Sequence, residues 1–295
     1  MTERALPTAA ANGTSTTTET SPPISALIFT LDEEPNLQRC LDSLRWCDDV
    51  IVVDSFSHDR TQAIARDAGA RVVQRAFTSM YDQRNWALLS AGAKHEWALI
   101  LDADERVPPE LAGEMARVAR DAPQEVAAYR VRRRFHLWGR WLEHSSLYPT
   151  WVVRLMRRDR ARFVRLGHGE IHELDGELGA LEHDLIDENA KGVVDWFDRQ
   201  NRYARREAQY ELDQESMSLG AEGLFSSDPV VRRKALKSFV ARMPGRAGAY
   251  FAYSYLLRRG FLDGADGLVF CGMRAMFQQM VSVHKYDLRR GRDGR

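Results

Sequence analysis

The stretch Trp97-Ala98-Leu99-Ile100-Leu101-Asp102-Ala103-Asp104-Glu105 decides the fold. Its first five residues are apolar and rich in branched side chains, which is typical of a strand buried on both faces of a sheet. Two carboxylates spaced i, i+2 follow directly. In an open α/β sheet, ligands bind beyond the carboxyl ends of the strands, so Asp102 and Asp104 are predicted to lie at a binding edge. The alternative is a solvated turn before a helix that begins at Pro108.

Strand-like and helical segments alternate around this stretch. Short apolar runs predict strands at 24–30, 50–53 and 71–74, and a helical segment follows each run. This alternation predicts an α/β fold with a mainly parallel, doubly wound sheet. Further strands are expected at 127–135 and 151–156.

Three of the predicted strands end beside acidic residues, namely residues 32–34, Asp54 and residues 102–104. Carboxylates that converge on one sheet edge repel one another unless cations or hydrogen-bond donors neutralise them. Oxygen ligands at the end of a rigid strand suit Mg²⁺ or Mn²⁺, ions that commonly bridge to substrate phosphates. A divalent-cation site is therefore expected at this edge.

Composition narrows the class of protein. The 295 residues include 42 basic and 42 acidic side chains, so the formal net charge is zero and we expect no nucleic-acid partner. Three scattered cysteines indicate a reduced, cytoplasmic setting rather than a disulfide framework. No run of about 18 apolar residues predicts a spanning helix. Residues 1–23 are predicted to be a disordered tail, 24–190 a catalytic domain and 191–295 a helical region.

The first strand-to-helix turn contains no glycine. A dinucleotide-binding loop and a P-loop both need glycines there, so that the backbone can approach the phosphates. A nucleotidyltransferase, the second class that we considered, would need a basic, glycine-rich loop at the same place. The sequence therefore argues against that class.

Four motifs succeed one another along the chain: Thr30-x-Asp32-Glu33-Glu34, Val52-Val53-Asp54-Ser55-x-Ser57, Gln83-Arg84-Asn85 and Leu101-Asp102-Ala103-Asp104-Glu105. In this order they resemble glycosyltransferase family 2, and most of all its lipopolysaccharide-core glucosyltransferase branch. The resemblance implies a GT-A fold and inverting transfer of a sugar from a nucleotide-sugar, expected to be a UDP-sugar, to a glycan or glycolipid. It also implies Mg²⁺ or Mn²⁺. Asp32 departs from the pattern, which usually has Asn there.

The resemblance further implies roles for single residues. The donor would be bound by residues of all four motifs: Thr30, Asp32, Glu33, Glu34, Asp54, Gln83, Arg84, Asn85, Asp102 and Ala103. The metal would be bound by Asp104, with Asp102 and His183 as further ligands.

An inverting transfer needs a carboxylate that takes the proton from the attacking hydroxyl. The stretch Gly167-His168-Gly169-Glu170-Ile171-His172-Glu173 holds a His-Glu pair where the resembling family has one. We expect Glu173 as the base and Glu170 as the second candidate. His172 would orient the base or contact a phosphate. An exposed loop is the alternative, and it is stronger for Glu170.

Two basic regions suggest further partners. Arginines at 130, 132 and 134 would share one face of a strand and meet a phosphorylated acceptor, unless that face is simply solvated. The helical region from 191 onward is aromatic, basic and amphipathic, which is typical of a helix on an anionic membrane face. Packing against the catalytic domain or a second subunit is the alternative. The cytoplasmic face of the inner membrane is thus an alternative location, and a degenerate domain acting as a membrane-surface module is the third class considered.

Overall fold

The computed structural model describes residues 21–166, 169–215 and 245–293. The tail predicted to be disordered lies almost wholly outside these residues. None of the helices in the described ranges is long and apolar enough to cross a membrane.

The first half of the central sheet is parallel. Its strands lie in the order β3 (Arg71–Gln74), β2 (Asp49–Asp54), β1 (Ile24–Thr30) and β4 (Trp97–Asp102). The helices that connect them are α1 (Glu34–Asp42), α2 (Thr61–Asp67) and α3 (Met80–Ser90). Every residue of β1 is buried, as expected for a central strand covered on both faces.

The second half of the sheet is mixed, and it adds antiparallel pairs to the parallel arrangement that the sequence predicted. β8 (Thr150–Arg157) is antiparallel to both β4 and β6 (Val126–Leu137), and β11 (Glu177–Glu188) is parallel to β6. The short strands β5 (Glu105–Arg106) and β7 (Arg140–Trp141) pair antiparallel with β11 and β6. The α4 helix (Pro109–Asp121) leads into β6, whereas no helix connects β6 to β8, so the chain turns back on itself.

Alternate residues of the strands feed two apolar layers. Ile24, Ala26 and Ile28 of β1 pack on the side of α1 and α4, whereas Leu27 and Phe29 pack on the side of α3. The second layer also receives Phe163 from β9 (Ala161–Leu166), which pairs with β10 (Gly169–Leu174) as a separate hairpin. The buried sheet therefore presents its strand ends rather than its faces.

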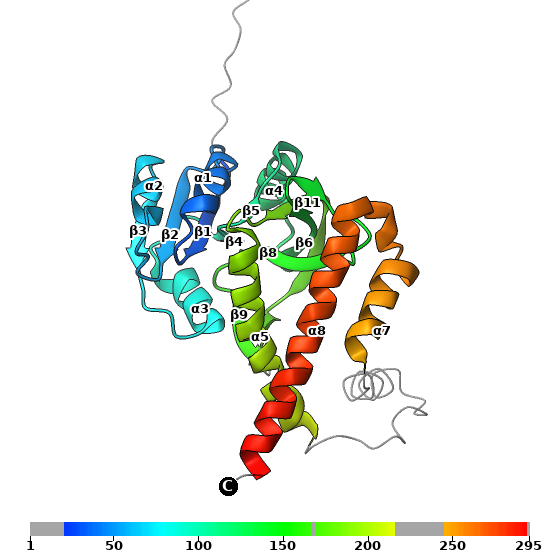
Figure 1. Ribbon diagram of the computed structural model, residues 1–295. Helices are drawn as coiled ribbons and strands as arrows, with labels where there is room; N and C mark the ends of the chain where they lie inside the picture. The colour runs from blue at the N-terminus through cyan, green and yellow to red at the C-terminus, as the bar shows by residue number, and fades with distance from the viewer. Residues whose placement is uncertain (1–20, 167–168, 216–244, 294–295) are drawn as a thin grey trace, which may run out of the picture.

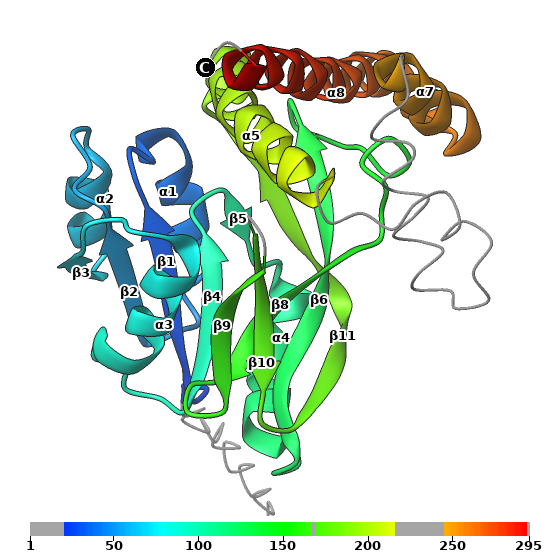
Figure 2. The same ribbon diagram turned by 90° about the horizontal axis from the view of Figure 1, so that it is seen from below.

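The C-terminal helical extension is confirmed. It comprises α5 (Gly192–Glu215), α7 (Arg246–Ala252), the turns η2 (Tyr253–Leu257) and η3 (Gly260–Asp263), and α8 (Gly264–Asp293). α5 and α8 run side by side across the carboxyl end of the sheet (Figure 1, Figure 2). Asp263 accepts hydrogen bonds from the backbone of His144 and Ser145, and the rings of Phe135 and Phe270 lie 4.9 Å apart. These contacts dock the helices onto β6 and the segment that follows it.

Candidate active site

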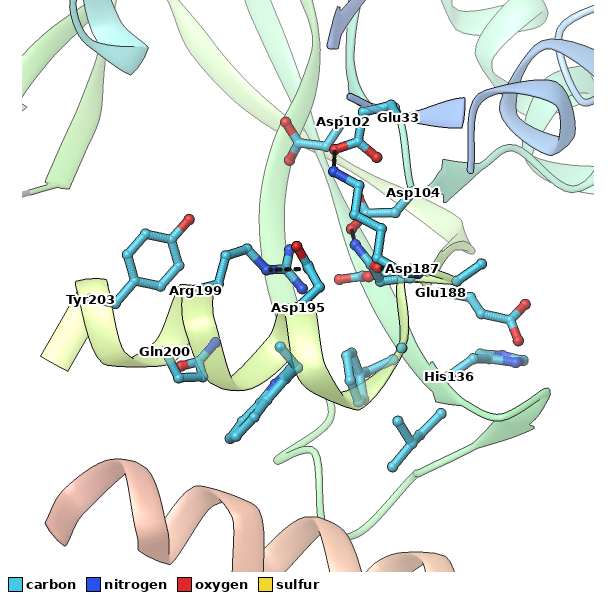
Figure 3. A pocket seen from close by; sticks show the side chains of 18 of the residues that line it. Glu33, Asp102, Asp104, His136, Asp187, Glu188, Asp195, Arg199, Gln200 and Tyr203 are labelled. Atoms are coloured by element: carbon cyan, nitrogen blue, oxygen red, sulfur yellow. Dashed lines mark hydrogen bonds and ion pairs between the residues drawn. The ribbon is translucent and has the colours of Figure 1, made fainter. Parts of the chain in front are cut away.

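A cleft of about 1140 Å³ opens between the carboxyl ends of the strands and the helices α5 and α8. Its floor is acidic, and Figure 3 shows the side chains of Glu33, Asp102, Asp104 and Asp187 gathered at one end of it. The predicted donor and metal residues that line it are Thr30, Asp32, Glu33, Gln83, Asp102, Ala103 and Asp104. The sheet brings them together because β2 and β4 flank β1, so their ends meet at one edge.

Two arginines form ion pairs with the negatively charged carboxylate of Asp102. Its two carboxylate oxygens accept hydrogen bonds from Arg84, at 3.0 Å, and from Arg154, at 2.8 Å. Burial alone would raise the pKa of Asp102, but the two guanidinium groups outweigh it and lower the pKa to about 2. Asp102 is thus a charged residue held by ion pairs. Its role as a metal ligand stays a prediction.

Asp104 lies beside a carboxyl group that the sequence did not single out, that of Asp187 at the end of β11. Asn189 donates a hydrogen bond to Asp104 over 2.8 Å. Burial, together with the negative charge of Asp104, raises the pKa of Asp187 to about 8, although Arg133 lies 3.2 Å away. The signal in the sequence was the acidic end of a strand, the same signal that identified Asp104.

His183, expected as a metal ligand, lies elsewhere. Its Nδ1 is 2.9 Å from Glu114 of α4, and it does not line the cleft. His183 lies four positions before Asp187 on β11, which is about 13 Å along a strand. Asp187 lines the cleft next to Asp104, whereas His183 does not.

The carboxylates in the cleft suit a cation that is also coordinated by the substrate. Within residues 21–166, 169–215 and 245–293, no group of three or more His, Cys, Asp or Glu side chains is arranged to hold a metal ion. Asp104 and Asp187 supply two carboxylates. Mg²⁺ is typically bound by one or two carboxylates, with substrate phosphates completing the shell. The pair fits that pattern.

The other predicted donor residues of the first two motifs divide into lining and supporting groups. Glu33 faces the cleft and is held by Lys191 at 2.6 Å. Asp54 is buried behind the wall, where Thr30 and the backbone N–H of Ser57 each donate to it over 3.0 Å. Glu34 likewise accepts from the backbone of residue 60 and does not line the cleft. Asp54 and Glu34 therefore shape the wall rather than the floor.

Only one residue of the Gln83-Arg84-Asn85 motif lines the cleft. Gln83 does so and donates to Ser55 over 2.7 Å. Arg84 points at Asp102. Asn85 donates to and accepts from the backbone of Phe163, at 2.8 Å each, and so fastens β9 to α3. Helical geometry explains the split, because successive residues point in different directions.

Glu173 lies outside the cleft. It forms an ion pair with Arg162 across the β9–β10 hairpin and lines a separate shallow hollow. The neighbouring His172 packs edge-to-face on Phe163 at 4.8 Å. Burial and the charges of Arg84 and Arg154 lower the pKa of His172 to about 4. Strand alternation thus sends His172 and Glu173 to opposite sides. The Glu170 side chain and residues 167–168 lie outside the described part of the chain.

The arginines of β6 are already engaged. Arg132 and Arg134 each donate to Asp184 over 2.6 Å, and Arg130 lies 4.6 Å from the ring of Trp151. Arg132 and Arg134 form ion pairs with buried Asp184, and Arg130 packs on Trp151. The geometry therefore does not support a role for these three arginines in acceptor binding.

The described residues form a mixed sheet whose strand ends carry paired carboxylates and face a helical wall across the cleft. A family model described as "Glycosyl transferase family 2" matches residues 25–190. The chain belongs to glycosyltransferase family 2, the family that the motifs resemble, and its α/β sheet with a C-terminal helical extension agrees with the GT-A fold expected of that family.

Relatives among characterised and uncharacterised proteins agree with this family. The chain is 32% identical over 146 residues to the "Lipopolysaccharide core biosynthesis glycosyltransferase LpsC" of Rhizobium meliloti, covering 48% of this chain and 53% of LpsC. It is 32% identical over 257 residues to an uncharacterized glycosyltransferase of Rickettsia prowazekii, covering 83% and 80% of the two chains. The chain thus spans only about half the length of LpsC.

A mannosyltransferase from Pyrobaculum calidifontis, in complex with GDP-Man and Mn²⁺, superposes with a TM-score of 0.48 at 16% identity, covering 91% of this chain and 88% of that one. Glucosyl-3-phosphoglycerate synthase from Mycobacterium tuberculosis, in complex with Mg²⁺ and UDP, gives a TM-score of 0.40 at 16% identity, with coverages of 63% and 79%.

Proposed function

We propose that this protein transfers a sugar, with inversion, from a nucleotide-sugar to a hydroxyl group of a glycan or glycolipid acceptor. A UDP-sugar is the expected donor, and lipopolysaccharide core or a related envelope glycan is the expected product. The observation that carries the proposal is the pair Asp104 and Asp187 beside neutralised Asp102 in the cleft. The family and the similarity to LpsC support it.

In this proposal Asp104 and Asp187 hold Mg²⁺ or Mn²⁺. The bound cation would neutralise the charge of the departing diphosphate. Thr30, Asp32, Glu33, Gln83 and Ala103 line the part of the cleft next to this pair, where the donor would lie. Arg84 and Arg154 keep Asp102 ionised, so Asp102 can accept hydrogen bonds from donor hydroxyl groups.

The experiment is a calorimetric titration of the protein with UDP, GDP and CDP, each with and without Mn²⁺. We expect one nucleotide to bind, and to bind at least tenfold more tightly when Mn²⁺ is present. Asp104→Asn and Asp187→Asn should each remove the effect of Mn²⁺. Asp48→Asn is the matched control, because Asp48 is an exposed carboxylate that pairs with His95 on another part of the surface.

Two results would count against the proposal. If none of the nucleotides binds with or without Mn²⁺, the donor assignment is wrong. If a nucleotide binds and the two cleft variants keep the Mn²⁺ effect, the donor assignment stands and the cation lies elsewhere.

We also propose that the corner between α7 and α8 faces an anionic membrane surface. Leu256, Leu257, Phe261 and Leu262 are exposed there, Leu257 at 77%, and Arg258 and Arg259 lie between them. Apolar side chains flanked by arginines match a surface whose headgroups are negative and whose interior is apolar. This location would bring the cleft close to a lipid-linked acceptor.

A further inference from the structure

The cleft has a basic wall opposite its acidic floor. Four arginines line this wall, three from α5 and one from α8. They are Arg199, Arg202, Arg206 and Arg274. Figure 3 shows Arg199 and Tyr203 on the same stretch of α5, across from the carboxylates.

The packing of α5 explains why these arginines face the cleft. Ala204 and Ala208 are fully buried and pack against Val281 of α8. Small residues spaced i, i+4 allow close approach of two helices on that side. Arg199, Arg202 and Arg206 follow the spacing i, i+3, i+7, which places them together on another face. The helix is therefore anchored by its alanines and presents a ladder of guanidinium groups.

This wall differs from the arginines around the floor, which are matched by carboxylates. Arg84 and Arg154 pair with Asp102, and Arg133 pairs with Asp187. On the wall, Arg199 lies 3.3 Å from Asp195, and Arg274 lies over the ring of Phe277 at 5.4 Å. For the part of the chain that the structure describes, neither Arg202 nor Arg206 has an acidic side chain within 4.0 Å. The wall thus carries excess positive charge inside a substrate-sized cleft.

We infer that this arginine ladder binds an anionic group, a phosphate or a carboxylate, on the acceptor. The inference rests on the proposed transferase function and adds the chemistry of its second substrate. Asn189, which hydrogen-bonds Asp104, lies just before α5, and the helix rises 1.5 Å per residue. Arg199 and Arg206 therefore lie about 10 and 21 Å along the helix from its first residue. If the acceptor hydroxyl lies near the acidic floor, the anionic group of the acceptor would lie about 10 to 21 Å from that end of α5, next to these arginines.

Guanidinium groups suit this role. Each presents a planar fork of N–H donors that matches two oxygens of a phosphate or carboxylate. Tyr203, exposed between Arg202 and Arg206 and also lining the cleft, offers a ring against which a sugar can lie. A neutral acceptor would leave this wall without a partner.

The test compares the double variant Arg202→Gln/Arg206→Gln with Arg205→Gln. Arg205 is an exposed arginine of the same helix that does not line the cleft, so it controls for general charge effects. The probes are glucose 6-phosphate, glucuronate and glucose, titrated by NMR at fixed ionic strength. We expect the two anionic probes to bind the wild-type protein more tightly than glucose. The double variant should weaken their binding at least tenfold, and Arg205→Gln less than twofold. The tighter of the two probes identifies the preferred anion.

Nucleotide binding in the presence of Mn²⁺ separates this inference from the proposed function. We expect the double variant to bind the nucleotide within twofold of the wild type. A loss of nucleotide affinity would mean that the ladder holds the donor diphosphate, which overturns the inference. Equal weakening by Arg205→Gln, or equal binding of glucose and the anionic probes, overturns it as well. Failure of the wild-type protein to bind any nucleotide would instead count against the proposed function.

Discussion

Three carboxylates at one sheet edge are accommodated in three different ways. Asp54 accepts hydrogen bonds from hydroxyl and backbone groups. Two arginines stabilise the negative charge of Asp102. Asp187 instead has its pKa raised to about 8, because it is buried beside Asp104. Hydrogen-bond donors thus stabilise the charge of Asp54 and Asp102, two of the carboxylates that the sequence predicted at this edge. Repulsion remains between Asp104 and Asp187, which the sequence did not single out, and this is why we place the cation there.

His172 gives a pH-dependence prediction. Burial and nearby arginines lower its folded-state pKa to about 4, below the value of about 6.5 in an unfolded chain. As pH falls from about 6.5 to 4, the unfolded chain binds a proton that the folded one does not, so the wild type loses stability. In His172→Gln this loss is absent. We expect the variant to gain up to about 2 kcal/mol relative to wild type between pH 7 and pH 4.5, measured by urea unfolding. A constant difference would contradict the assignment.

Glu173 gives a prediction that separates structure from family resemblance. Its ion pair with Arg162 lies outside the cleft, so Glu173→Gln should keep transferase activity within about threefold of wild type. Removal of a general base typically lowers the rate by about 10² to 10⁴. Glu170→Gln, measured in the same assay, tests the second candidate. A hundredfold loss in Glu173→Gln alone would favour the resemblance over this geometry.

At the scale of elements, α5 has two functions in one helix. One face packs on α8 through small residues, and another faces the cleft. Near its end, Glu211 accepts from Arg246 and from Lys285, at 2.9 Å each, in a buried network that joins α5, α7 and α8. This network holds the cleft wall in place.

Glu211→Gln tests that network. The substitution removes the carboxylate that Arg246 and Lys285 share at 2.9 Å, and loss of one member of a buried ion pair typically costs about 3 kcal/mol. We expect a corresponding loss in the free energy of unfolding measured with urea. The control Asp198→Asn removes an exposed carboxylate of the same helix and should change stability by less than about 0.5 kcal/mol. Equal effects would show that the network contributes nothing specific.

At the scale of the whole molecule, the helical extension forms one wall of the cleft and also carries the exposed corner at residues 256–262. The protein would then meet a membrane with the helices and the nucleotide with the sheet. The two surfaces are built from different elements, so they can be altered separately.

Leu257→Glu tests the membrane-facing corner. Leu257 is the most exposed apolar residue there, and a glutamate would be repelled by anionic headgroups. We expect co-sedimentation with phosphatidylglycerol vesicles to fall at least fivefold, with nucleotide binding unchanged. Leu89→Glu, an equally exposed leucine on α3, is the control. No binding of wild type to such vesicles, or equal loss in both variants, would exclude the corner as a membrane contact.

Much of the fold could be predicted from local sequence. Burial on both faces makes a strand a continuous apolar run, as in β1 and β4, and the carboxylates that end those runs marked the edge where the cleft lies. The direction of the later strands could not be predicted in this way. An apolar run reads alike in a parallel and in an antiparallel pair, and the mixed half of the sheet depends on how the chain turns.

The sequence alone predicted where strands and helices lie and which of them carry the carboxylates and arginines, because periodicity and strand ends are local properties. Only the tertiary structure determined which of them share a site. Asp104 and Asp187 are 83 positions apart, and nothing local shows that their strands end at one cleft. The same holds for charge: the pKa of Asp102 is lowered and that of Asp187 is raised because of neighbours that folding supplies. Glu173 and His183 illustrate the reverse, since their strands place both side chains outside the cleft.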